Sequence, residues 1–196
     1  MVDYMTNIIK KFIAEYKPGS DLVKPDNELL DFGKKVLPQD ILDLWEEYGF
    51  GEYGNGFIKV VDPREYMHSL YTWLGKQDFT KVPIMVSAFG DIFYFRRLSD
   101  TENDISMLDI HYRRIDVCAY SYQEFFESYL FNEDVKEKIL RLSLYDQAVD
   151  KLGPISFKEC FYFVPALVTG GAEDIKYIQK GDANVHQHML FQLGMK

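Results

Sequence analysis

Apolar residues recur at helical spacing in the first third of the chain, and this pattern predicts three helices. They are expected over residues 4–16, 37–49 and 62–75, where apolar side chains three and four positions apart form one stripe. The third helix begins with Asp62 as its N-cap followed by Pro63. The stripes of the first two helices are Met5, Ile8, Phe12 and Tyr16, and Ile41, Leu44, Trp45 and Tyr48.

The middle of the chain changes to the residue types that are typical of β-strands. Residues 82–97 contain two β-rich runs joined at Gly90 and Asp91, and residues 104–120 contain two more. A polar, turn-rich link separates the two pairs. Because no helical segment lies between these runs, we expect a meander of about four antiparallel strands and no βαβ unit.

Helical spacing returns after residue 120. It predicts helices over residues 121–131, 132–142 and 143–153, and the remaining residues predict short strands and a terminal helix. The predicted fold class is α+β, with an antiparallel sheet of about four to six strands flanked by N-terminal helices and a mainly helical C-terminal subdomain. The predicted units are residues 1–120 and 121–196, packed on one another.

Gly49, Gly51 and Gly54 spell G-x-G-x-x-G, the fingerprint of dinucleotide-binding loops. In such a loop the glycines follow a strand and open a helix, whose N-terminus binds the pyrophosphate. Here a predicted helix ends at Gly49 and a strand begins near Phe57, so the order is inverted. We interpret the glycines as a helix stop and a tight passage into the first strand, and we expect no cofactor.

Candidate metal ligands are sparse. His186 and His188 stand two apart in a segment expected to be helical, which points their rings away from each other. Asp109 and His111 share a face of a predicted strand, but no further ligand of matching type stands nearby. Both pairs are interpreted as structural or surface residues, and we predict no metal site.

No motif supports covalent catalysis. Cys118 and Cys160 lie in apolar, β-like sequence, where thiols are usually inert, and neither G-x-S-x-G nor H-E-x-x-H occurs. Two reduced thiols fit a cytoplasmic protein, and a disulfide between them stays open. We predict no catalytic residue and a protein that is not an enzyme. A hydrolase with dispersed residues is the enzymatic alternative.

Charge adds a functional expectation. The 196 residues carry a net charge of −9, which disfavours direct binding to nucleic acid and favours a basic partner. No apolar run is long enough to span a membrane, and the first residues lack the features of a signal peptide. We therefore expect a cytoplasmic protein with no membrane contact.

Acidic residues concentrate on the predicted outward faces of one helix and one hairpin link. A solvated surface is the ordinary explanation for such a pattern, and a contact with a cationic cleft on another protein is the sharper hypothesis. The candidate partner-binding residues are Asp40, Asp43, Glu46, Glu47, Asp100, Glu102 and Asp104.

Two regions of the chain resemble known families. Residues 36–66, VLPQDILDLWEEYGFGEYGNGFIKVVDPREY, resemble the signature of the GAD-like domain and, more distantly, the SUKH immunity superfamily. The segments FVPALVTGG and HQHMLFQLG are similar to the C-terminal domain of type VI secretion immunity proteins of the DNase-toxin kind. The resemblance implies a protein that binds and neutralises a cognate toxin, expected to be a basic nuclease. The acids named above are not part of the family pattern.

A second function class also fits the sequence. The aromatic segment FGDIFYFRR ends in Arg96 and Arg97, and it could line a small-ligand or regulatory binding pocket. The two arginines point to opposite faces of a strand, so only one of them can face such a pocket. A sizeable apolar pocket with one convergent arginine would favour this alternative.

Overall fold

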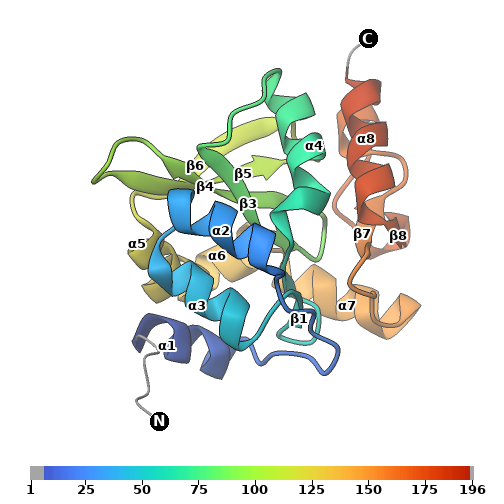
Figure 1. Cartoon of the computed structure of the whole chain (residues 1–196). Coiled ribbons are helices and arrows are strands. Elements are labelled where there is room, and N and C mark those ends of the chain that lie inside the picture. The colour runs from blue at the N-terminus through green and yellow to red at the C-terminus, as the bar shows by residue number, and fades with distance from the viewer. Residues whose placement is uncertain (1–6, 195–196) are drawn as a thin grey trace.

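Six strands form one antiparallel sheet whose order in space is the order along the chain (Figure 1). The computed structural model describes residues 7–194. The last four strands are the predicted meander, and two shorter strands extend the sheet to six, which confirms the α+β fold class. The bounds are β1 Gly51–Tyr53, β2 Ile58–Val60, β3 Lys81–Ser87, β4 Ile92–Arg97, β5 Asn103–Asp109 and β6 Arg114–Ala119.

The three predicted N-terminal helices are present as α1 Asn7–Glu15, α3 Gln39–Glu47 and α4 Pro63–Leu74. Met5, predicted in the first stripe, lies outside the described residues. Helix α4 starts as expected, because the Asp62 side chain accepts a hydrogen bond from the Arg64 backbone N–H at 2.9 Å. Gly75 ends the helix in the left-handed region with φ of 69°.

Helix α2 (Asn27–Val36) was not predicted from the sequence. It is short, and Gly33 interrupts its apolar pattern. Glycine in a helix interior costs about 1 kcal/mol of stability relative to alanine. The structure supplies the reason for the glycine, since a Cβ at Gly33 would lie 2.6 Å from Cδ2 of Leu42 on α3. Glycine therefore lets α2 and α3 cross closely, which the periodicity alone does not reveal.

Each face of the sheet has its own core. Neighbouring residues of β4 point to opposite faces, so Phe93 joins the larger core with Phe12 of α1, and Ile92 joins the smaller one. The smaller core also contains Leu70 of α4 and Leu190 of the terminal helix. Helices from both ends of the chain therefore cover the same sheet.

The C-terminal part is mainly helical and contains short strands, as predicted, and its two strands pair with each other in a separate antiparallel sheet. Its position is fixed by aromatic packing, since Phe161 of β7 contacts Phe89 with ring centres 6.0 Å apart. The elements are α5 Tyr122–Glu127, η1 Tyr129–Phe131, α6 Glu133–Lys138, α7 Leu142–Leu152, β7 Glu159–Phe163, η2 Leu167–Thr169, η3 Ile175–Tyr177, β8 Ile178–Asp182 and α8 Ala183–Leu193.

The glycines of the G-x-G-x-x-G segment connect α3 to β1 and β2, so the predicted helix-to-strand order is confirmed. Residues 18–23 cross this segment, and Val23 forms a bridge with Phe50. Gly49 has φ of 104°, and a Cβ there would lie 2.6 Å from the Val23 carbonyl oxygen. The glycine is thus required by a close passage of two backbone segments.

Candidate partner-binding site

The N-terminal unit is defined here as residues 7–119, through β6, and the C-terminal unit as residues 121–194. Tyr122 of α5 joins the start of α3 to the β4–β5 hairpin. Its hydroxyl donates to Asp40 Oδ2 at 2.8 Å, and its backbone N–H donates to Asn103 Oδ1 at 3.0 Å. Asp40 is consequently only 8% exposed, and its carboxylate contacts α5 inside the protein. Helical periodicity cannot reveal this partner, because Tyr122 is 82 residues away in the chain.

The remaining acids of α3 lie at the surface. Glu46 and Glu47 are exposed, and Asp43 is half-buried and accepts a hydrogen bond from the Gln39 side chain at 2.8 Å. Lys24 donates its ammonium group to the backbone carbonyl oxygens of Glu46 and Glu47. A lysine here stabilises the negative end of the helix dipole and offsets part of the local negative charge.

The three acids of the hairpin have different environments. The Asp100 side chain is 95% exposed and pairs with Arg97 at 2.7 Å, and Glu102 is exposed. Asp104 is 3% exposed, and both of its oxygens accept hydrogen bonds from the guanidinium of Arg96, at 2.7 and 2.5 Å. The bidentate pair joins β4 to β5 and neutralises Asp104 within the sheet.

The hairpin acids Asp100 and Glu102 line a groove of about 360 Å³, whereas none of the predicted acids of α3 is among its lining residues. The groove also contains Lys34 and Lys35 from the end of α2, so its charge is mixed. Arg97 crosses it and donates to the Lys35 carbonyl oxygen at 2.9 Å. The predicted acids that keep access to solvent are the half-buried Asp43 and the exposed Glu46, Glu47, Asp100 and Glu102.

The arginines of the small-ligand alternative are already paired within the protein. Arg96 is held by Asp104, and Arg97 pairs with Asp100 and with the backbone of α2. Arg97 lines the 360 Å³ groove together with Phe95 of the aromatic strand, but its guanidinium binds these protein groups there.

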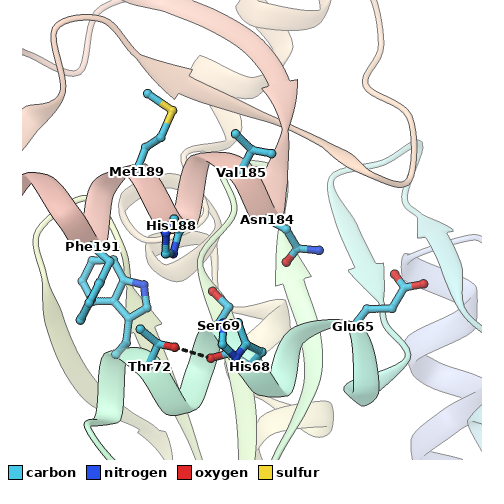
Figure 2. A pocket seen from close by; sticks show the side chains of 10 residues that line it. Glu65, His68, Ser69, Thr72, Asn184, Val185, His188, Met189 and Phe191 are labelled. Atoms are coloured by element: carbon cyan, nitrogen blue, oxygen red, sulfur yellow. Dashed lines mark hydrogen bonds between the residues drawn. The ribbon is translucent and has the colours of Figure 1, made fainter.

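A second groove, of about 560 Å³, lies between α4 and α8 and is lined by both units (Figure 2). His188 and Phe191 of α8 point toward α4, whereas Val185 and Met189 lie on the outer side of α8 and are 58% and 53% exposed. Trp73 also lines the groove, and its buried Nε1 has no hydrogen-bond acceptor among the described residues. The surface of the groove is mainly apolar.

A buried ion pair connects the two units. Arg141, at the start of α7, is 5% exposed and donates through Nη1 to Asp91 Oδ2 at 3.0 Å, and through Nε to Glu173 at 2.7 Å. Asp91 lies in the β3–β4 turn, is completely buried, and also accepts from the Ile110 backbone N–H at 3.2 Å. Burial raises the pKa of Asp91, and the neighbouring Arg141 charge opposes this shift. Sequence patterns give no sign of this pair.

Two histidines are also buried where the units meet. The ring of His111 lies 2.8 Å from the Phe89 carbonyl oxygen through Nε2, and His186 stacks on Tyr162 with ring centres 4.1 Å apart. Burial lowers the pKa of each histidine to about 4, so both are neutral at pH 7. His188, in contrast, is exposed, as expected for two rings that point apart on a helix.

The described residues contain no group of three or more His, Cys, Asp or Glu side chains arranged for a metal ion. Cys118 and Cys160 are free thiols, which settles the open question of a disulfide in this structure. Burial raises the pKa of both thiols to about 12, so neither is a thiolate at neutral pH.

Lys59 of β2 provides a further contact between the units. It is completely buried, and its Nζ donates to the backbone carbonyl oxygens of Ser156, at 2.9 Å, and Glu159. No carboxylate directly pairs with it among the described residues, and burial lowers its pKa to about 8. A buried ammonium held by carbonyl oxygens alone makes stability depend on pH.

We predict that Lys59→Met removes this dependence. Between pH 8 and 10.5 the unfolded chain keeps the Lys59 proton that the folded chain has lost, so rising pH favours the folded state. The free energy of unfolding of the natural protein should therefore rise relative to Lys59→Met, by up to about 3 kcal/mol across this window. Urea unfolding at several pH values measures the difference. Lys158→Met, at an exposed lysine, is the control. If both variants show the same dependence of unfolding free energy on pH, the pH dependence does not come from Lys59.

Comparison with known proteins gives two family matches. Residues 7–109 match the model of the GAD-like domain, and residues 119–194 match the model described as T6SS immunity protein Tdi1, C-terminal, where T6SS denotes type VI secretion. No curated protein matches the sequence. No helix in the described part of the chain has the length and apolar character to cross a membrane.

The fold is shared with a solved structure, that of Atu4351 from Agrobacterium tumefaciens. The TM-score is 0.73 at 14% sequence identity, and the match covers 94% of this chain and 89% of that chain. At this identity the similarity shows the fold alone. The GAD-like match spans more than half of the sequence. The chain therefore belongs to the GAD-like family, and its C-terminal match indicates a type VI secretion immunity protein.

Proposed function

We propose that this protein neutralises a cognate type VI secretion toxin by binding it, and that the toxin is a nuclease. The observation that carries the proposal is the match of residues 119–194 to an immunity family, in a chain with a net charge of −9. A nuclease must attract phosphate groups with lysine and arginine. An acidic protein can occupy or cover such a surface, and opposite charges speed the encounter.

The proposed contact surface is the exposed part of the predicted acidic set. Glu46 and Glu47 at the end of α3 and Glu102 in the hairpin are exposed, and the half-buried Asp43 and the exposed Asp100 lie on the same two elements. The buried Asp40 accepts a hydrogen bond from Tyr122, an arrangement that holds α3 beside the hairpin. Asp104 contributes through its pair with Arg96 inside the sheet. We place neutralisation in the cytoplasm, by association and without catalysis.

The groove between α4 and α8 is the competing contact surface within the same function. Trp73 and Phe191 line the groove in contact with each other, and the exposed Val185 and Met189 lie at its rim on α8, so it offers the apolar surface that many protein interfaces contain. Both family matches contribute to it. The acidic set is preferred because a basic toxin is attracted by charge, whereas the groove carries only one acid, Glu65, among its lining residues.

The function is tested by co-expression with the protein encoded next to this one. We expect that neighbour to stop growth and degrade DNA or RNA when expressed alone, and to do neither when this chain is present in the same cytoplasm. The two proteins should co-purify. A neighbour that is harmless alone, or that stays toxic beside this chain, contradicts the proposal. If the neighbour is neutralised by this chain but degrades a substrate other than DNA or RNA, the immunity function holds and the nuclease assignment is wrong.

A further inference from the structure

The two edges of the six-stranded sheet are treated differently by the chain. At β1 the edge is covered by residues 18–23, where the Gly19 N–H donates to the Glu52 carbonyl at 2.8 Å. Val23 and Phe50 exchange two more backbone bonds at 2.8 Å each. At the other edge β6 pairs with β5 alone, and no further strand follows it among residues 7–194. One edge is closed and the other is open.

The open edge carries exposed apolar side chains. Ile115 and Val117 alternate with Arg114 and Asp116 along β6, and they are 46% and 43% exposed. An exposed, apolar edge strand presents unpaired backbone groups to other chains, and proteins commonly protect such edges with charged side chains, lysine above all. Here the two charged residues have opposite signs, and they pair with each other at 3.0 Å.

This charge pattern is complementary to itself. When two copies of a strand pair antiparallel about a twofold axis, one residue faces its own counterpart and its two neighbours exchange partners. With Ile115 on the axis, Arg114 of each copy faces Asp116 of the other, on the same face of the sheet. With Arg114 or Asp116 on the axis, like charges face each other. The register centred on Ile115 is therefore the one that pairs opposite charges.

We propose that the open edge binds a second copy of this chain, through antiparallel pairing of β6 with β6 about a twofold axis at Ile115. The pairing joins the two sheets into one, covers the exposed Ile115 side chains with each other, and forms two Arg–Asp pairs between copies. Helix α3 leads into β1 at the other edge, so this interface is separate from the proposed toxin-binding acids of that helix.

The oligomeric state of the purified full-length protein tests this directly. Sedimentation velocity over a wide concentration range should show a reversible monomer–dimer equilibrium. Arg114→Asp alone and Asp116→Arg alone each place like charges opposite one another, and each should weaken dimerisation by about tenfold or more. The exchanged double variant restores both pairs and should dimerise within about threefold of the natural protein.

A mixing experiment makes the test specific to this register. The two single variants, each weak as a homodimer, carry complementary edges and should form a heterodimer when mixed. Ile115→Lys places two ammonium groups on the axis and should leave the chain monomeric. Because Arg114 also pairs with Asp109 at 3.3 Å, thermal unfolding of every variant is measured alongside to separate loss of dimer from loss of fold.

Three outcomes overturn the proposal. The first is a natural protein that stays monomeric at all concentrations. The second is a dimer that persists in Ile115→Lys, and the third is a failure of the two single variants to associate when mixed. A monomeric protein in which Ile115→Lys weakens toxin binding would assign the edge to a strand of the toxin instead. Neutralisation in the co-expression assay does not depend on these results, so the two proposals fail separately.

Discussion

Replacing Arg141 by methionine should lower the free energy of unfolding by about 3–5 kcal/mol at pH 7, because it leaves a buried carboxylate without its partner. Asp91 is completely buried, and the Arg141 side chain is 5% exposed, so water cannot replace the lost charge. The pair connects the β3–β4 turn to α7, and its loss should loosen the contact between the two units. Urea unfolding followed by tryptophan fluorescence measures the change.

The pH dependence of this loss identifies its cause. Without the Arg141 charge, burial raises the pKa of Asp91 in the folded state further above that of the unfolded chain, and only the hydrogen bonds from Ser87 and Ile110 oppose this shift. The folded variant then binds a proton that the unfolded chain does not, so its stability falls as pH rises through this range and recovers as pH falls. The deficit relative to the natural protein should be greatest at neutral pH.

Two further variants serve as controls for Arg141→Met. Lys138→Met breaks an ion pair with Asp134 whose side chains are 71% and 76% exposed, and it should cause no measurable change. The double variant Asp91→Asn, Arg141→Met should recover part of the loss, since it removes the unpaired Asp91 charge. The recovery is partial because Glu173 and the buried Asp109 still lose the Arg141 charge. If Arg141→Met proves as harmless as Lys138→Met, the buried pair does not hold the units together.

Reversing the charges of Asp43, Glu46 and Glu47 to lysine should slow association with the toxin by about tenfold at low salt. Each replacement adds two charges, so the net charge rises from −9 to −3. Salt screens the natural attraction, and the association rate of the variant should therefore depend less on ionic strength. Stopped-flow or surface binding kinetics at several salt concentrations provide the measurement.

The matched control reverses Glu127, Asp146 and Asp150, three exposed acids of α5 and α7. This control changes the net charge by the same amount but leaves α3 intact. If the toxin contacts α3 specifically, the control should slow association less than the α3 variant does. Met189→Asp tests the groove between α4 and α8 and should leave the kinetics unchanged. If Met189→Asp accelerates dissociation while the α3 variant binds normally, the groove is the toxin-binding surface and the acidic set is not.

The outline of the fold could be predicted because its signals are local. The Asp62 N-cap and Gly75 C-cap of α4 act within one turn of the chain, and the alternation in β4 follows from the geometry of a single strand. The order of elements around Gly49 was likewise sufficient to exclude a nucleotide loop. Helix α2 escaped prediction because Gly33 serves a contact with α3, a requirement that its own segment does not display.

The candidate site could be predicted only in part, since exposure depends on distant partners. Asp40 and Asp43 look alike on a helical projection, yet Tyr122 contacts only the first of them. Asp104 follows Asp100 and Glu102 in one polar stretch, and only the pairing of β4 with β5 places it opposite Arg96. A surface-charge argument from sequence cannot separate these cases.

The sequence by itself determined the α+β class, both ends of α4 and the four-stranded meander, because caps, alternation and turn residues act over a few neighbouring positions. Its short signature segments were likewise enough to indicate the family. Only the tertiary structure decided which acids remain at the surface, which carboxylate Arg141 neutralises, and which edge of the sheet stays open. These properties arise from contacts between residues tens of positions apart, and chain folding alone brings such residues together.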